Sequence, residues 1–247
     1  MLTIALAGDM GAGLGTMGLS LGGFLVIWVV MMAAMMFPSV APMAVAWIRT
    51  MSARPTRAAR VVGITSFLGG YLLAWAAFGV VVYVILRAAD RFAGDAPAAA
   101  RWAGAAVFAV AGIYQLTPLK SVCLRHCRSP LGSVVHYASY SGPARDLRVG
   151  VHHGLYCVGC CWGLMIVLVA VGAMNIPAMV ALAGVIFLEK VWRHGAGFAT
   201  AVGVVLLAAA VFTVFSAALV PGLQQQPMTS MDTTPTVVPA SPAMDGM

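Results

Sequence analysis

The sequence predicts an all-α integral membrane protein, a bundle of about six transmembrane helices with both termini outside. Hydrophobic residues make up 62% of the 247 residues and charged residues only 9%, with a mean hydropathy of +0.96. A soluble domain is nearer half apolar and a quarter charged. Apolar runs also recur along the chain, and a run of about 18 or more residues can cross a hydrocarbon core of roughly 30 Å.

Six apolar segments are predicted to cross the membrane. The third and fifth are short, and the first is not expected to be a cleaved signal peptide because no basic region precedes it and no small-residue cleavage site follows. The segments are 20–48, 61–86, 101–117, 149–171, 175–189 and 197–220.

The basic residues give the predicted orientation. Of the 14 Lys and Arg residues, 11 fall in alternate loops, which the positive-inside bias places in the cytoplasm. An even number of helices then puts both termini outside the cell's cytoplasm. The predicted location of the protein is the inner membrane of a bacterium. This distribution also accounts for the net charge of +7 without a nucleic-acid partner. The 11 residues are Arg49, Arg54, Arg57, Arg60, Lys120, Arg125, Arg128, Arg145, Arg148, Lys190 and Arg193.

Three regions follow from this pattern. Residues 1–19 form a Gly-rich external lead-in, and residues 20–221 form the six-helix transmembrane domain. Residues 222–247 are rich in Pro, Ser and Thr, so we expect a disordered external tail.

All five cysteines lie in one short part of the chain. Cys123 and Cys127 flank His126 in the predicted third-to-fourth loop, where cytoplasmic thiols stay reduced. An odd cysteine count also argues against a disulfide framework. The sequence therefore favours metal binding or redox chemistry.

The remaining cysteines lie in the predicted fourth helix, within 153-HGLYCVGCCWGLM-165. At 100° per residue, the soft ligands of this segment share an arc of roughly 140°. Imidazole, thiolate and thioether ligands of this kind select Cu(I), Zn or an iron–sulfur cluster. A single buried cysteine ordinarily packs as a small hydrophobic residue, so plain packing stays an alternative. The candidate ligands are His153, Cys157, Cys160, Cys161 and Met165.

Further ligands must come from other segments. The first helix carries Met31 with Met35 and Met32 with Met36 at i,i+4 spacing, followed by Pro38 and Pro42, which open the backbone locally. Met35 and Met36 are candidate soft ligands, although methionine is also ordinary membrane filler.

A few polar residues accompany these motifs. Glu189 is a functional candidate because an acid inside a membrane is costly, although pairing with Lys190 is an alternative. Asn175 is expected to cap the fifth helix before Pro177. His136 and His152 lie near the cytoplasmic boundary, and for His136 a surface position is favoured.

The motifs AMMFPS, TPLKSVCLRHCRSP, GLYCVGCCWGLM, GAMN and LEK occur here in the order that they have in a known bacterial family. Over roughly residues 25 to 193 the chain resembles domain of unknown function 2182, described as predicted metal-binding integral membrane proteins. The resemblance implies a membrane metal site and supplies no reaction. The positions that it points to are Cys123, Cys127, Cys157, Cys160 and Cys161, with Met35, Met36, Asn175 and Glu189 as accompanying motif positions.

Copper binding or transfer through this Cys/Met/His site is the favoured function, with zinc or iron as alternative metals. The expected partners are the lipid bilayer, a metal ion, and a metallochaperone or a hetero-oligomeric membrane subunit. One alternative is the membrane subunit of a metal-dependent oxidase or monooxygenase for hydrophobic substrates. Another is a thiol–disulfide oxidoreductase, whose cysteine layout resembles that of vitamin K epoxide reductase-like proteins. Whether the protein is an enzyme stays open at this point.

Overall fold

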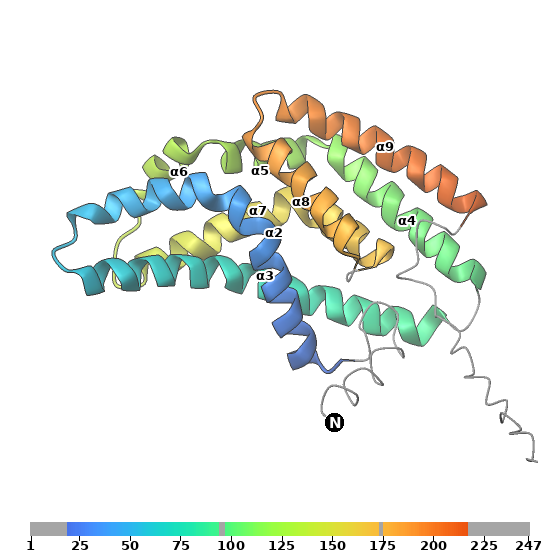
Figure 1. The fold of residues 1–247 in the computed structure, drawn as a ribbon, viewed down its shortest axis with the longest axis horizontal. Helices are drawn as coiled ribbons and strands as arrows, with labels where there is room; N and C mark the ends of the chain where they lie inside the picture. Colours follow the sequence, from blue (N-terminus) through green and yellow to red (C-terminus); the bar gives the residue numbers. More distant parts are fainter. Residues whose placement is uncertain (1–18, 94–96, 173–174, 217–247) are drawn as a thin grey trace, which may run out of the picture.

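The computed structural model describes residues 19–93, 97–172 and 175–216. Within these ranges every regular element is a helix, which confirms the all-α class (Figure 1). The predicted tail 222–247, and all but the last residue of the predicted lead-in 1–19, lie outside the described residues. The elements are α2 (Leu21–Thr50), η2 (Met51–Ala53), α3 (Arg57–Ala93), α4 (Pro97–Leu116), α5 (Pro118–Arg128), α6 (Pro130–Tyr137), α7 (Arg145–Val171), α8 (Ile176–Val191) and α9 (Gly195–Phe215).

Within the described residues each of the six predicted segments corresponds to one helix, namely α2, α3, α4, α7, α8 and α9, and residues 217–220 of the last segment lie outside the described residues. The predicted loop between the third and fourth segments contains two further helices, α5 and α6. Thr117 caps α5 by accepting a hydrogen bond from the backbone N–H of Lys120 at 3.3 Å, and Pro118 opens the helix. The predicted Asn175 cap of α8 is also present, because its side chain accepts from the N–H of Ala178 at 3.0 Å.

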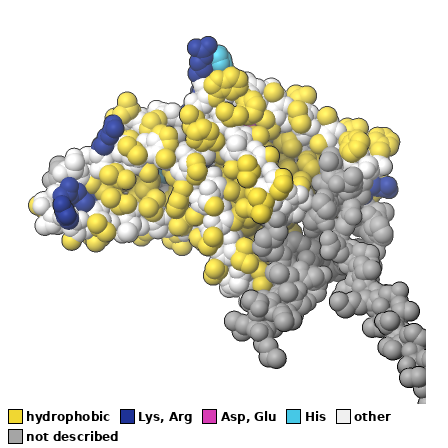
Figure 2. All heavy atoms as spheres, in the orientation of Figure 1, with side chains coloured by type: hydrophobic (Ala, Val, Ile, Leu, Met, Phe, Trp, Pro, Cys, Tyr) yellow, Lys and Arg dark blue, Asp and Glu magenta, His cyan; other side chains and the backbone are white. Residues whose placement is uncertain are grey.

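Four helices are long and apolar enough to cross a membrane: α2, α3, α7 and α9. A fifth span results if α4 and α5, which meet at a bend of 66°, are taken together. Apolar side chains are spread widely over the face seen in Figure 2. The exposed apolar residues of α9 include Val204, Val205 and Phe212. An exposed apolar surface of this extent is compatible with a membrane protein. The predicted number of spans and the placement of the termini stay predictions.

Glycines allow α3 and α7 to pack with their backbones in close contact. A Cβ atom on Gly150 would lie 2.1 Å from the carbonyl oxygen of Phe67, and one on Gly70 would lie 2.3 Å from that of Leu147. Small residues at helix crossings are typical of membrane bundles because they let backbones approach closely. The consequence for the site is that side chains of α3 reach the cysteine face of α7.

Polar contacts fix the ends of the helices around α7. Arg54 and Asp146 form an ion pair at 2.7 Å, which ties the start of α3 to the start of α7. Arg128, at the end of α5, donates to the carbonyl oxygens of Trp192 at 2.7 Å and Arg193 at 3.0 Å. The ends of α5 and α8 are therefore held together beside α7.

The helix α2 runs through both of its prolines and bends along its length in Figure 1. Pro38 and Pro42 each remove a helix hydrogen bond, which is a recognised cause of bending. The helix packs mainly against α3, α6 and α8. Its methionines Met32 and Met36 are fully buried in the core.

Candidate metal centre

Three thiols meet on one face of α7. The sulfur atoms of Cys157, Cys160 and Cys161 all lie within 4.8 Å of one another, and the three residues are buried. The spacing i, i+3, i+4 places the residues on one face, because a helix turns once in about 3.6 residues. The thiols of Cys160 and Cys161 both donate to the carbonyl oxygen of Cys157, at 3.1 and 2.8 Å. These hydrogen bonds turn both sulfur atoms back towards Cys157.

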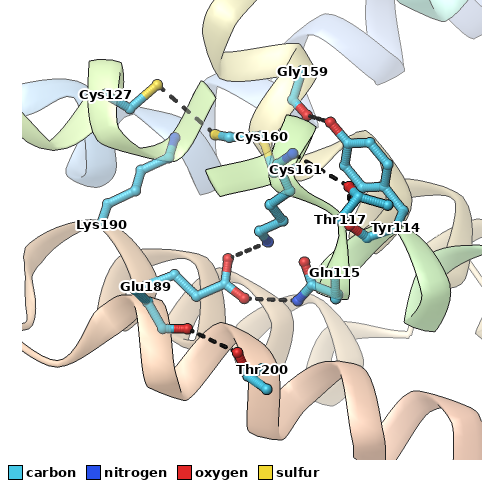
Figure 3. Close-up of polar contacts among 12 residues, drawn as sticks. Tyr114, Gln115, Thr117, Cys127, Gly159, Cys160, Cys161, Glu189, Lys190 and Thr200 are labelled. Carbon is cyan, nitrogen blue, oxygen red and sulfur yellow. Dashed lines mark hydrogen bonds and ion pairs between the residues drawn. The ribbon is translucent and has the colours of Figure 1, made fainter. Parts of the chain in front are cut away.

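A fourth cysteine approaches from α5. The sulfur atoms of Cys127 and Cys160 lie 3.8 Å apart, and Figure 3 shows the two side chains pointing towards one another. Cys127 is not part of the compact group formed by the three α7 thiols, so its contact is with the Cys160 side of the site. The two cysteine motifs of the sequence are thus brought together by the packing of α5 on α7.

Cys123 lies one helical turn before Cys127 on α5, against the backbone of α7. A Cβ atom on Gly159 would lie 3.0 Å from the sulfur of Cys123, so the glycine makes room for this side chain. Cys123 is only partly buried. In the described part of the chain it makes no hydrogen bond to another thiol, unlike Cys127. Its role as a ligand stays a prediction.

The ammonium group of Lys190 reaches the thiols from α8. Its nitrogen donates to the sulfur of Cys157 at 3.0 Å, and the hydroxyl of Tyr71 on α3 lies 3.0 Å from the same sulfur. Figure 3 shows Lys190 extending from α8 towards the cysteines. Among the described residues no carboxylate lies within ion-pair distance of Lys190, and the residue is only 7% exposed. A buried cation is costly unless a negative group compensates its charge, and the sulfur that Lys190 contacts, that of Cys157, would supply that charge as a thiolate.

Sequence reasoning missed Lys190 and Tyr71 as parts of the site. Lys190 counts as a loop cation in the sequence, and so does Lys120, yet both are buried. The sequence did contain a signal for their burial. Each lysine lies within one helical turn of the end of a predicted apolar segment. Tyr71 carries no signal of its own in the sequence, since it lies in a uniform apolar helix.

Glu189 is paired with Lys120 on α5 and not with its neighbour Lys190. One carboxylate oxygen accepts from the Lys120 ammonium at 2.6 Å, and the other accepts from the Gln115 amide at 2.7 Å (Figure 3). All three residues are buried. Both oxygens therefore already have partners, and the pair holds α8 against α4 and α5.

The predicted histidine and methionine ligands have different surroundings. His153 is 2% exposed, and its Nδ1 has no hydrogen-bond partner in the described part of the chain, although its ring neighbours Phe67 and Tyr71. His126 stacks on Tyr156, with ring centroids 3.9 Å apart. The thioethers of Met35, Met36 and Met165 belong to the same buried core as the α7 cysteines. Their coordination of a metal stays a prediction.

The thiol geometry suits a single soft metal ion. Three sulfur atoms that each bind one ion at about 2.3 Å lie roughly 3.8–4.0 Å from one another. The three α7 thiols lie within 4.8 Å of one another, so they need to approach by about 1 Å or less to share an ion. Thiolate ligands select Cu(I), Zn or iron–sulfur clusters over hard cations such as Mg or Ca.

The comparisons with known proteins agree with this chemistry. The model of a family named PpoB2, described as copper chaperone, matches residues 25–213. The match spans well over half of the chain and includes every cysteine, so the chain belongs to this family. No curated protein and no solved structure matches the chain.

Proposed function

We propose that this member of the PpoB2 copper chaperone family is a multi-pass membrane protein that binds Cu(I) at Cys157, Cys160 and Cys161 and passes it on through Cys127. The observation that carries the proposal is the group of three buried thiols beside a buried ammonium. The family match supports copper as the metal among those that thiolates accept.

The charges of the site fit a bound Cu(I) ion. One Cu(I) with two of the three cysteines as thiolates and the third as a neutral thiol carries a net charge of −1, and the ammonium of Lys190 brings the buried group to neutrality. The same lysine also neutralises Zn(II) with three thiolates, so the charge alone does not choose between the metals. The second nearby lysine, Lys120, is already neutralised by Glu189 at 2.6 Å and adds no net charge.

Cys127 is the residue best placed to exchange the ion. It lies on a different helix from the other three thiols, 3.8 Å from Cys160, and is less buried than they are. An incoming ion can be held by Cys127 and Cys160 before it reaches the inner thiols, and an outgoing ion can follow the reverse order. Each step replaces one thiolate by another, so the copper never loses all of its ligands in a dry environment.

The proposal extends to location and partners. The alternate loops that carry most of the basic residues are placed in the cytoplasm of a bacterium, which puts the mouth of the site on the cytoplasmic side of the inner membrane. A soluble metallochaperone or a second membrane subunit would then meet the protein at that side. The helices that are long enough to span support the location, while the orientation rests on the charge pattern.

The direct test is elemental analysis of the full chain, purified in detergent under reducing conditions after copper-supplemented expression. We expect stoichiometric copper in the wild-type chain and its loss when Cys157, Cys160 and Cys161 are all changed to Ala. Cys123→Ala is the matched control, since Cys123 lies outside the compact thiol group. Stoichiometric zinc would favour a structural role for the same residues, and absence of metal would contradict the proposal.

A second function is favoured by the contact between Cys127 and Cys160. Their sulfur atoms are 3.8 Å apart, so a disulfide of about 2.05 Å needs an approach of roughly 1.8 Å. This distance suits a thiol–disulfide exchange protein in which the two cysteines open and close a bond. Mass spectrometry after mild oxidation discriminates the two functions, because the redox function requires a reversible Cys127–Cys160 disulfide in a metal-free chain.

A further inference from the structure

Four of the five histidines in the chain gather beside the thiol site, although they come from three helices. His126 lies on α5, His136 on α6, and His152 and His153 on α7. The ring centroids of His126, His136 and His152 form a nearly equilateral triangle, with sides of 6.1, 6.1 and 5.6 Å. The sequence reveals only one close histidine pair, because the other two rings are brought in by the fold.

The hydroxyl of Tyr137 lies between two of these rings. It is 2.8 Å from Nε2 of His126 and 3.2 Å from Nδ1 of His152. A phenol hydroxyl has a single proton, so it donates to one ring while its oxygen accepts from the other. Two imidazole nitrogens from different helices thus point at the same place.

We propose that His126, His136 and His152 form a second metal site, separate from the thiols, which binds a borderline divalent cation such as Cu(II) or Zn(II). Imidazole is a preferred ligand for these ions. An ion about 2.0–2.1 Å from three imidazole nitrogens in tetrahedral geometry holds the ring centroids roughly 5 Å apart. The observed triangle is larger, with sides of 6.1, 6.1 and 5.6 Å, so the three rings must rotate and approach one another to share an ion.

Aromatic packing explains why these rings lie together, but it does not explain why ring nitrogens of His126 and His152 point at the same hydroxyl group. The stacking of His126 on Tyr156 buries ring surface as any aromatic pair does. It does not require the ring nitrogens of His126 and His152 to converge on one hydroxyl. The exposure of the site is also suited to uptake, because His136 is exposed and His152 is only partly buried.

The histidine site adjoins the thiol site through two short connections. His126 precedes Cys127 directly on α5, and His153 lies one helical turn before Cys157 on α7. The ring of His153 is 6.0 Å from that of His126, and its buried Nδ1 has no partner among the described residues. A buried ring nitrogen without a partner is unusual and fits a position that a ligand or an ion satisfies.

The experiment uses the full chain in detergent with all five cysteines changed to Ser, so that only the histidines can bind the probe, Cu(II) alone. We expect one tightly held Cu(II) per chain, with an electron paramagnetic resonance spectrum split by imidazole nitrogens. Adding His136→Ala and His152→Ala should abolish this spectrum. His194→Ala, in the fifth and exposed histidine, should leave it unchanged. Failure to retain Cu(II), or equal loss with His194→Ala, would overturn the proposal.

A second measurement guards against misfolding of the cysteine-free chain. In the chain with its cysteines, Zn(II) binding is compared before and after His136→Ala and His152→Ala, two side chains at or near the surface. We expect the histidine changes to remove one equivalent of bound Zn(II). In a separate measurement under reducing conditions, the same variant should retain the copper that is bound to the thiols. Loss that follows the cysteines and not the histidines would contradict a separate site. The result does not depend on whether the thiols carry copper in the cell.

Discussion

The ammonium nitrogen of Lys190 lies 3.0 Å from the sulfur of Cys157, and both residues are buried in the bundle. This contact joins α8 to the cysteine face of α7 and places a positive charge beside the group of three cysteines. A buried lysine is costly unless a negative group compensates its charge. The pair therefore indicates a site that holds negative charge in its working state.

Replacing Lys190 by Leu should weaken Cu(I) binding, because it removes the ammonium group without adding another soft ligand beside the thiols. A hydrogen bond to a charged group contributes about 1.5–3 kcal/mol, so we expect the affinity to fall roughly 10- to 100-fold. Competition with a Cu(I) chelator of known affinity measures the change. Arg193→Leu, which removes one exposed positive charge nearby, serves as control, and equal affinities for wild type and Lys190→Leu would contradict the prediction.

Changing Cys127 to Ser should slow copper transfer while the copper content is kept. The three α7 thiols stay in place, but the exchange ligand 3.8 Å from Cys160 is lost. We expect the rate of release to an external chelator to fall about tenfold or more, the effect of a barrier raised by roughly 1.4 kcal/mol. Cys123→Ser should release copper at the wild-type rate. If both variants behaved alike, Cys127 would have no special part in transfer.

Gly70→Ala should destabilise the protein and weaken the metal site together. The added Cβ would lie 2.3 Å from the carbonyl oxygen of Leu147, which forces α3 away from α7 and moves Tyr71 away from Cys157. Overpacking of this kind costs about 1–3 kcal/mol. Gly69→Ala is a matched control one residue earlier, where a Cβ meets nothing within 4 Å. Thermal unfolding in detergent should show a lower midpoint for Gly70→Ala alone.

Lys120→Met should lower stability more than it lowers copper content. It leaves the carboxylate of Glu189 buried without its ion-pair partner, and breaking a buried pair in this way costs about 3–5 kcal/mol. The double variant with Glu189→Leu should recover much of that loss, because no charge then stays unpaired. Copper lost from a well-folded Glu189→Gln variant would instead identify Glu189 as a ligand, as the sequence motif predicts.

Removing the metal should lower the thermal stability of the wild-type chain. A ligand that binds only the folded state at 100 times its dissociation constant stabilises by about 2.7 kcal/mol. We therefore expect a Cu(I) chelator to lower the unfolding midpoint of the wild type and to leave the variant lacking Cys157, Cys160 and Cys161 unchanged. An equal shift in both chains would place the stabilising metal elsewhere.

The apolar segments could be predicted because length and composition report directly on helices of this kind. Within the described residues each of the six segments corresponds to a helix, and the Asn175 cap is where the local pattern predicts it. The helices α5 and α6 could not be found by the same route, because they are too short and too polar for a span. Their starts are nevertheless marked by Pro118 and Pro130, each at the beginning of its helix.

The sequence alone determined the three-cysteine face, since the spacing of Cys157, Cys160 and Cys161 is set by the helical repeat within one element. Only the tertiary structure decided what faces it. Cys127, Lys190 and Tyr71 come from three other helices, and the glycine contacts between α3 and α7 bring one of those helices within hydrogen-bond distance. The histidine triangle likewise depends on three helices. Helical periodicity relates neighbours within a segment, whereas partners far apart in the chain are fixed by how the helices pack.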